Sequence, residues 1–270
     1  GAMNADAIFF LFSTVNNQLA ARGAHLNAVM PGPARAEPDT LSAHNPGAFP
    51  ESLVSLTERL REHGAGPGLH LPPGETEPEC NTAMRTRIEE LIAQRGVRFF
   101  HFDLDDSACP TASPDRSQDR CFEPRAAALA GLLDLVRDTG PDVLTGVGAR
   151  PVPSPWWLAR AHAMRLGTAR VPQNHTVPAL HPSDRAATFI DALLFDLQER
   201  QHLPLPTYAL LTQGMGRTDA GRAEPFQTWA DNVMLHLGRG VQLRELSVTP
   251  SRMDGRRWDT LATGLQWAAS

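Results

Sequence analysis

The sequence of 270 residues contains no lysine, so all 25 of its basic residues are arginine. Chemistry that depends on a catalytic lysine, such as Schiff-base formation or phosphate binding by a P-loop, is therefore disfavoured. The chain has no basic excess either, because its 30 acidic residues give a formal net charge of −5. Proteins that bind nucleic acid usually carry a basic surplus, so we expect no nucleic-acid partner.

The sequence also lacks a long apolar run. No stretch reaches the roughly 18 consecutive apolar residues that a membrane-spanning helix needs, so we expect no membrane span. With 41% hydrophobic and 20% charged residues, the composition is typical of a soluble globular chain with a sizeable core. Disorder over the whole length is excluded by the same apolar content.

Cysteine is scarce: only Cys80, Cys109 and Cys121 are present, too few for a disulfide framework and without CxxC metal spacing. Cys109 and Cys121 flank one loop. A bridge between them predicts a periplasmic or secreted protein and free thiols predict a cytoplasmic one, and both alternatives stay open. Residues 1–3, Gly-Ala-Met, resemble the remnant of a purification tag, so a removed signal peptide would not be visible.

Short β-prone segments alternate with segments of helical period along the whole chain, which predicts one α/β domain over residues 4–270. Strands are expected at Asp6–Ser13, Ala24–Met30, Gly68–Leu71, Val97–Asp103, Val143–Val147, Thr168–Val171, Thr207–Leu211 and Val241–Val248. Helices are expected at Pro50–His63, Asn81–Arg95, Glu123–Thr139, Trp156–Leu166, Arg185–Arg200, Glu224–Leu237 and Gly255–Ala268. This order predicts a (β/α)8 TIM barrel; the alternative, an open doubly wound sheet, lacks the support of a GxGxxG or P-loop motif.

In such a barrel, functional residues lie at the C-terminal ends of the strands. The fourth expected strand runs into His101, Asp103 and Asp105, which the alternation of a strand places on one face. A carboxylate there is costly unless it is paired or functional, so Asp103 and Asp105 are candidate catalytic residues. The segment also resembles the DxDxT motif of haloacid-dehalogenase phosphatases, but three expected strands precede it and that family's lysine is missing.

Other strand ends carry candidates for ligand binding. Adjacent tryptophans after a barrel strand can form a stacking platform for a sugar ring, although tryptophan also packs between helix and barrel. The candidates are His70, Arg150, Trp156, Trp157 and Gln213.

A metal site is the alternative use of the histidines. His70, His101, Asp103 and His175 offer nitrogen and oxygen ligands, but the chain has no HxH, no HExxH and no Cys/His cluster. We therefore expect hydrogen-bonded histidines, no metal and no cofactor.

Several segments, in the right order, resemble the melibiase or α-galactosidase-like retaining glycoside hydrolases. Residues 68–73 (GLHLPP) resemble that family's "G-L-W-x-x-P" passage, and residues 96–103 (GVRFFHFD) its "G-V-x-x-F-K-F-D" strand. Residues 154–158 (SPWWL) resemble its "S-P-W/F-W-L", and residues 243–250 (LRELSVTP) its "L-x-E-L-Y-I-T-P". Together these segments span most of the chain.

The resemblance implies a retaining glycoside hydrolase of bacterial type that acts on an α-linked sugar or a bacterial polysaccharide. Asp103 matches the nucleophile, which works with a second carboxylate about 5 Å away. The family's lysine before the nucleophile is His101 here, and two acidic positions, one of them fit for the acid/base, are His162 and Arg170. The acid/base candidates are therefore Glu245 and Asp105.

Two hypotheses follow. The favoured one is an enzyme that binds carbohydrate, with two carboxyl groups within about 6 Å of each other. The other is a degenerate barrel that binds carbohydrate or a protein partner without turnover, with Asp103 isolated or held by an arginine. In either case the expected sugar-contacting residues are His70, His101, Arg150, Trp156, Trp157, Arg170 and Gln213.

Overall fold

The computed structural model describes residues 5–30, 50–71, 81–104, 117–149, 154–165, 188, 191–203, 205–216, 225–241 and 243–270. The chain divides into two compact units. Unit 1 comprises Gly1–Thr14, Leu26–Val152 and Trp156–His162, and unit 2 comprises Val15–His25, Pro153–Pro155 and Ala163–Ser270. Each unit is built from parallel strands with helices in the connections.

Unit 1 contains four parallel strands that pair in chain order. Parallel neighbours need a crossover, and helices supply it here. The strands are β1 (Ala28–Val29), β2 (Gly66–Leu71), β3 (Phe99–Leu104) and β4 (Leu144–Ala149), and the helices are α2 (Pro50–Glu62), α3 (Asn81–Ala93) and α4 (Ser117–Thr139). The expected helices at Pro50–His63 and Asn81–Arg95 are confirmed by α2 and α3. The expected helix Glu123–Thr139 is confirmed in part, because α4 already begins at Ser117.

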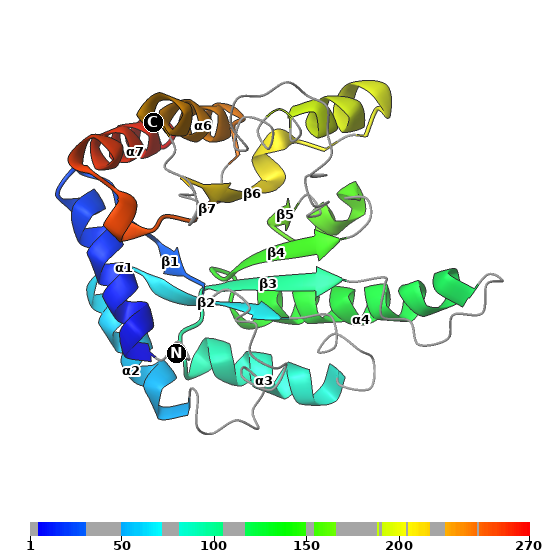
Figure 1. The fold of residues 1–270 in the computed structure, drawn as a ribbon. Helices are drawn as coiled ribbons and strands as arrows, with labels where there is room; N and C mark the ends of the chain where they lie inside the picture. The colour runs from blue at the N-terminus through cyan, green and yellow to red at the C-terminus, as the bar shows by residue number, and fades with distance from the viewer. Residues whose placement is uncertain are drawn as a thin grey trace. The chain divides into compact units, whose positions relative to one another are not determined.

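The core of unit 1 lies between the strands and the helices. Every residue of β2 is buried, and α4 packs both on β3 and on α3 (Figure 1). Strands buried on both faces carry near-continuous apolar runs, and the adjacent Phe99 and Phe100 of β3 are an example. The largest fully buried side chains of this core are Phe100, Phe102, Leu56, Leu60, Ile88, Leu129, Leu132 and Leu133.

Unit 2 contains three parallel strands, β5 (Ala163–Arg165), β6 (Leu210–Met215) and β7 (Leu243–Leu246), which also pair in chain order. Its helices α6 (Phe226–Gly238) and α7 (Gly255–Trp267) pack against each other. Shorter helical turns are the 3₁₀ segments η4 (Pro155–Ala159, at the unit boundary), η6 (Thr207–Ala209) and η7 (Pro250–Arg252), and the π-turn η5 (Asp196–Arg200).

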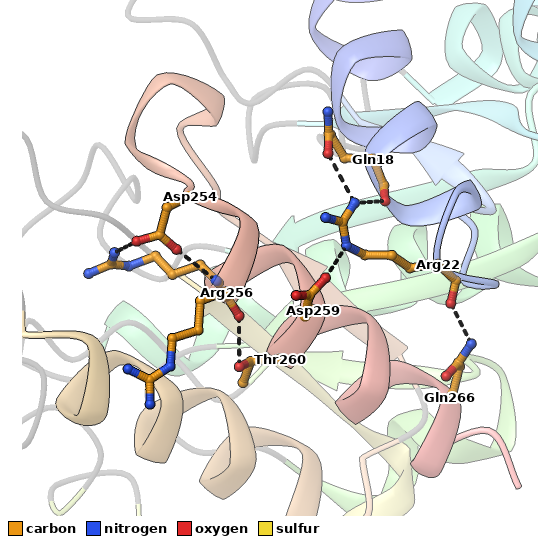
Figure 2. A network of polar contacts seen from close by, with 8 residues as sticks. Gln18, Arg22, Asp254, Arg256, Asp259, Thr260 and Gln266 are labelled. Carbon is orange, nitrogen blue, oxygen red and sulfur yellow. Dashed lines mark hydrogen bonds and ion pairs between the residues drawn. The ribbon is translucent and has the colours of Figure 1, made fainter.

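Polar contacts in unit 2 join the end of α1 (Ala5–Ala20) to α7 (Figure 2). The guanidinium of Arg22 donates to Asp259 at 2.6 Å, and the side chain of Gln266 donates to the carbonyl of Arg22 at 2.6 Å. Gly23 lies between them with a φ of +76°, and a Cβ there would come within 2.6 Å of the Gln266 amide. Glycine is therefore required where α1 turns toward α7.

The expected first strand, Asp6–Ser13, is wrong: these residues belong to α1. The apolar run Ile8–Phe12 suggested a strand, but buried positions along the helix recur every three or four residues. Phe12 is 2% exposed and Phe10 is 72% exposed, whereas a strand would place both on one face. The buried stripe consists of Ala5, Ile8, Phe12, Val15 and Leu19.

The expected helix Trp156–Leu166 is also wrong beyond its first turn. Residues 155–159 form η4, and Ala163–Arg165 form β5, which pairs with β6. Alanine, methionine and arginine favour a helix, but the almost fully buried Ala163 and Met164 gain more from strand pairing and burial. The expected strand Thr168–Val171 lies outside the described residues.

The α/β class with parallel strands is confirmed. The described residues contain seven strands instead of the eight expected, and they do not show a closed barrel. Among these residues, no helix is long and apolar enough to span a bilayer.

Candidate active site

The candidate site lies at the C-terminal ends of β2 and β3. His70 on β2 stands in register with His101 on β3, and Asp103 follows two residues later. The side chains of His101 and Asp103 lie on one face of β3, as the alternation predicts. Phe100 and Phe102 are fully buried, with ring centroids 6.0 Å apart. The strand therefore anchors one face in the core and presents a polar cluster on the other.

Both oxygens of the Asp103 carboxylate are hydrogen-bonded to histidine. The Nε2 atom of His70 lies 2.8 Å from Oδ2, and the Nε2 atom of His101 lies 3.1 Å from Oδ1. An ionised carboxylate only accepts hydrogen bonds, so both imidazoles donate. The two rings are stacked, with centroids 5.2 Å apart and planes 18° apart. The two histidines thus fix the position and the rotation of the carboxylate.

The cluster is buried on the histidine side and open at the carboxylate. His70 and His101 are buried, whereas the side chain of Asp103 is 31% exposed. Burial alone would raise the pKa of Asp103, but the hydrogen bonds from His101 and His70, with their positive charge, hold this pKa well below its usual range. The Asp103 side chain is therefore an ionised carboxylate with a solvent-facing edge.

Two glycines on β4 make room for this cluster, and sequence reasoning missed both. Gly146 pairs with His101 and Gly148 with Asp103. A Cβ at position 146 would lie 2.9 Å from Nδ1 of His101, and one at position 148 would collide with Oδ1 of Asp103. The available signal was the G-x-G spacing inside a strand, because glycine there often marks a close approach.

The two tryptophans after β4 have different environments. Trp157 is buried, and Trp156 packs against it edge-on with ring centroids 4.7 Å apart. Trp156 is 50% exposed, and the guanidinium of Arg160 lies over its ring at 4.9 Å. Only Trp156 therefore presents an aromatic surface to solvent, while Trp157 supports it from the core.

The other acid/base candidate in the described part, Glu245, lies on β7 in unit 2. Its carboxylate accepts a hydrogen bond from Arg165 on β5 at 2.8 Å. Asp103 belongs to unit 1, so the structure places the two carboxylates in different units. Gln213 lies on β6, where the pairing with β7 shifts register between Thr212 and Met215. The side chain of Gln213 lies outside the described side chains.

His162, which stands at an acidic position of the resembled family, has a structural role. Its Nδ1 atom accepts a hydrogen bond from the backbone N–H of Thr145 at 3.1 Å, near the start of β4. Burial lowers the pKa of His162, which favours the neutral ring that this bond requires. The remaining sequence candidates, Asp105, Arg150, Arg170 and His175 and the Cys109–Cys121 bridge, lie outside the described residues or side chains.

The donor atoms of His70, His101 and Asp103 all lie within 4.8 Å of one another. In the part of the chain that the structure describes, this is the one group of three or more metal-ligating side chains. Two imidazole nitrogens and a carboxylate oxygen form a donor set that suits first-row transition metals.

Sequence comparison finds no match to a protein-family model or to a curated protein. Solved structures do match. A GH36 α-galactosidase from Geobacillus stearothermophilus, in complex with stachyose, superposes with a TM-score of 0.61 at 12% identity, over 99% of this chain and 40% of that one. A hydrolase from Arthrobacter globiformis, in complex with cyclic α-maltosyl-(1→6)-maltose, gives a TM-score of 0.55 at 12% identity, over 99% and 74%.

A chitinase from Rhizomucor miehei matches with a TM-score of 0.51 at 13% identity, over 90% of this chain and 93% of that one. The chain spans 40% of the length of the α-galactosidase and most of the chitinase. Identities this low establish the fold alone. The chain therefore has the α/β fold of glycoside hydrolases.

Proposed function

We propose that this chain is a retaining glycoside hydrolase that acts on an α-linked sugar or a bacterial polysaccharide. The observation that carries the proposal is the carboxylate of Asp103, which is held by two histidines at the C-terminal end of β3. That end of a strand is where glycoside hydrolases of this architecture place their catalytic groups.

In the proposed reaction, an oxygen of Asp103 attacks the anomeric carbon, and the bond to the leaving oxygen breaks. A second carboxylic acid gives its proton to the leaving oxygen, and as a carboxylate it then takes a proton from the water that releases the sugar. Glu245 and Asp105 are the candidates for this second group. The solvent-facing edge of Asp103 leaves it accessible to a substrate.

The sugar-binding residues are His70, His101, Trp156, Arg150, Arg170 and Gln213, with Trp157 as the support of Trp156. Because Trp156 is exposed and packs edge-on against the buried Trp157, it suits stacking on a pyranose. Two of the structural neighbours, solved with stachyose and with a cyclic maltosyl-maltose, favour an α-linked substrate.

The test is covalent trapping of the nucleophile. The protein is incubated with activated fluoro-glycosides of several sugars, and its intact mass is measured before peptide mapping. We expect one glycosyl unit on the peptide that carries Asp103, and no label on Asp103→Asn. A label on a different carboxylate, or none with any sugar, would overturn the proposal.

The second candidate function is a barrel that binds carbohydrate or a protein partner without turnover. Glu245 favours it, because Arg165 already engages this carboxylate at 2.8 Å. Binding on a glycan array that survives Asp103→Asn, with no trapped intermediate, would support this function. Absence of both a trapped intermediate and glycan binding would exclude the hydrolase and the carbohydrate-binding barrel.

A further inference from the structure

We infer that His70, His101 and Asp103 form a binding site for a divalent first-row transition metal such as Zn²⁺. This inference goes beyond glycoside hydrolysis and does not depend on it. It departs from the sequence-based expectation of hydrogen-bonded histidines without a metal. We expected no metal because the chain has no HxH, HExxH or Cys/His motif. The sequence does not show that β2 pairs with β3 and so brings His70 next to His101.

The donor atoms are arranged for one ion. Both imidazoles direct Nε2 toward the same carboxylate, at 2.8 and 3.1 Å. A tetrahedral ion with bonds of about 2.1 Å holds its ligands about 3.4 Å apart. The two contacts with the carboxylate must therefore open by about half an ångström, and the widest separation of the donor atoms, which all lie within 4.8 Å of one another, must close. The three ligands come from adjacent positions on two paired strands, which makes the site rigid.

Burial gives the site a closed side and an open side. His70 and His101 are buried, while Asp103 is 31% exposed, so solvent reaches the cluster at the carboxylate. Three protein ligands with one position left for water or substrate is the pattern of reactive zinc sites. Because both imidazoles donate to Asp103 through Nε2, each must release that proton before Nε2 can coordinate an ion. The negative charge of Asp103 then favours the cation.

The space around the ligands is set by β4. Because Gly146 and Gly148 carry no Cβ, His101 and Asp103 can lie flat over this strand. A side chain at position 148 would collide with Asp103 and come within 3.1 Å of Nε2 of His101. Gly146 and Gly148 therefore leave the room that the three side chains need, although neither glycine supplies a ligand.

Two differences from the resembled family converge here. The position of His70 is a tryptophan in the quoted pattern, and that of His101 is a lysine. Neither of those residues is a usual metal ligand, whereas imidazole is the most common one. In the structure, His70 and His101 come from different strands and both contact Asp103, so the three side chains form one donor set.

The donor chemistry selects the ion. Nitrogen ligands disfavour Mg²⁺ and Ca²⁺, which take oxygen, and a set of two imidazoles and one carboxylate suits Zn²⁺, Co²⁺, Ni²⁺ or Fe²⁺. A bound ion draws electron density from the carboxylate of Asp103, so metal binding should suppress the attack of Asp103 on a sugar. A trapped glycosyl group and a bound ion should therefore compete.

The test is a metal titration of the full chain, freed of any tag and stripped with a chelator. Co²⁺ is followed by its visible absorption, and Zn²⁺ by competition with a chromophoric chelator. We expect one equivalent bound, with affinity lowered at least about 100-fold by His70→Gln, His101→Gln or Asp103→Asn. The matched control His63→Gln removes an exposed histidine of the same unit, and it should bind like the parent chain.

A second pair of variants leaves all three ligand residues unmutated. Gly148→Ala should weaken binding by displacing Asp103, whereas Gly131→Ala, on α4, should not, since its new Cβ finds its nearest atom at 3.8 Å. Circular dichroism verifies folding. Absence of a bound equivalent in the parent chain, or binding kept in all three ligand variants, would overturn the inference. Because the readout is metal binding, failure of glycosyl trapping leaves it intact, and the reverse also holds.

Discussion

At the residue scale, the position of Asp103 depends on the absence of a side chain at Gly148. We expect Gly148→Ala to lower the free energy of unfolding by about 1–3 kcal/mol, because the new methyl group collides with Asp103 in a packed strand. Gly131→Ala is the control: it should be neutral or stabilise by up to about 1 kcal/mol, as alanine favours a helix. Urea unfolding of both variants measures the difference. Equal stabilities would show that Asp103 moves aside freely.

The candidate site was only partly predictable from single residues. Alternation along 99–104 correctly placed His101 and Asp103 on one face, because that rule needs only one strand. The contact of His70 with Asp103 depends on the register between two strands separated by a helix. A single sequence carries no direct signal for that register, and the same holds for the two glycines of β4.

At the scale of elements, α1 offers a direct test of helix against strand. Phe12→Ala should cost about 3–5 kcal/mol, because its side chain is buried, while Phe10→Ala should change stability by less than about 0.5 kcal/mol. In a strand the two residues would share a face and behave alike. Thermal or urea unfolding of the two variants distinguishes a helix from a strand. Similar losses of stability in Phe12→Ala and Phe10→Ala would contradict the helix.

The helix α6 contains a buried histidine whose protonation should destabilise unit 2. Burial, followed by the neighbouring Arg239, lowers the pKa of His236 from 6.5 to about 4, although Asp191 acts in the opposite direction. The guanidinium of Arg239 lies 3.1 Å from Nδ1, a contact that requires the neutral ring. The unfolded chain thus takes up a proton between pH 6.5 and pH 4 that the folded chain excludes.

The contribution of neutral His236 to the free energy of unfolding is therefore fully present above pH 6.5, and it is lost as the pH falls toward 4. The full difference in pKa corresponds to about 3 kcal/mol in the free energy of unfolding. His236→Gln should flatten the pH dependence over this window relative to the parent chain, and the exposed His202→Asn should not. Parallel urea titrations from pH 4 to pH 7 measure it; identical slopes for His236→Gln and the parent would contradict the burial argument.

Elements were predictable where local pattern and tertiary environment agree. α2, α3, α6 and α7 follow helical periods with typical termini, and the structure contains them near the expected bounds. α1 was missed because five consecutive apolar residues hid its period. β5 was missed because its residues favour a helix, and only the pairing with β6 makes them a strand.

At the scale of the whole molecule, the first residues matter more than their position suggests. Ala5, Ile8 and Phe12 are buried, Asp6 pairs with Arg59 at 2.7 Å, and residues 1–14 belong to unit 1. Deleting residues 1–14 removes the buried side chains of Ala5, Ile8 and Phe12. We expect this loss to lower the free energy of unfolding by more than about 5 kcal/mol, which is comparable to the total stability of a domain. We expect this deletion to abolish the cooperative urea transition seen by circular dichroism.

Deleting only residues 1–3, the expected tag remnant, is the control and should leave the transition unchanged. A cooperative transition of normal midpoint after deletion of 1–14 would show that unit 1 does not need this segment. The expectation of a single domain over 4–270 stays a prediction. Agreement between calorimetric and van't Hoff enthalpies of unfolding would support it.

The glycines of β4 also constrain how this protein can vary in evolution. Asp103, His101 and Gly148 occupy neighbouring positions on two strands, so a change at one alters what the others tolerate. In homologues, a side chain larger than hydrogen at position 148 should occur only where the aspartate or the histidine has been replaced. Covariation between positions 101, 103 and 148 in an alignment of homologues would thus show, without any assay, that these residues have evolved together.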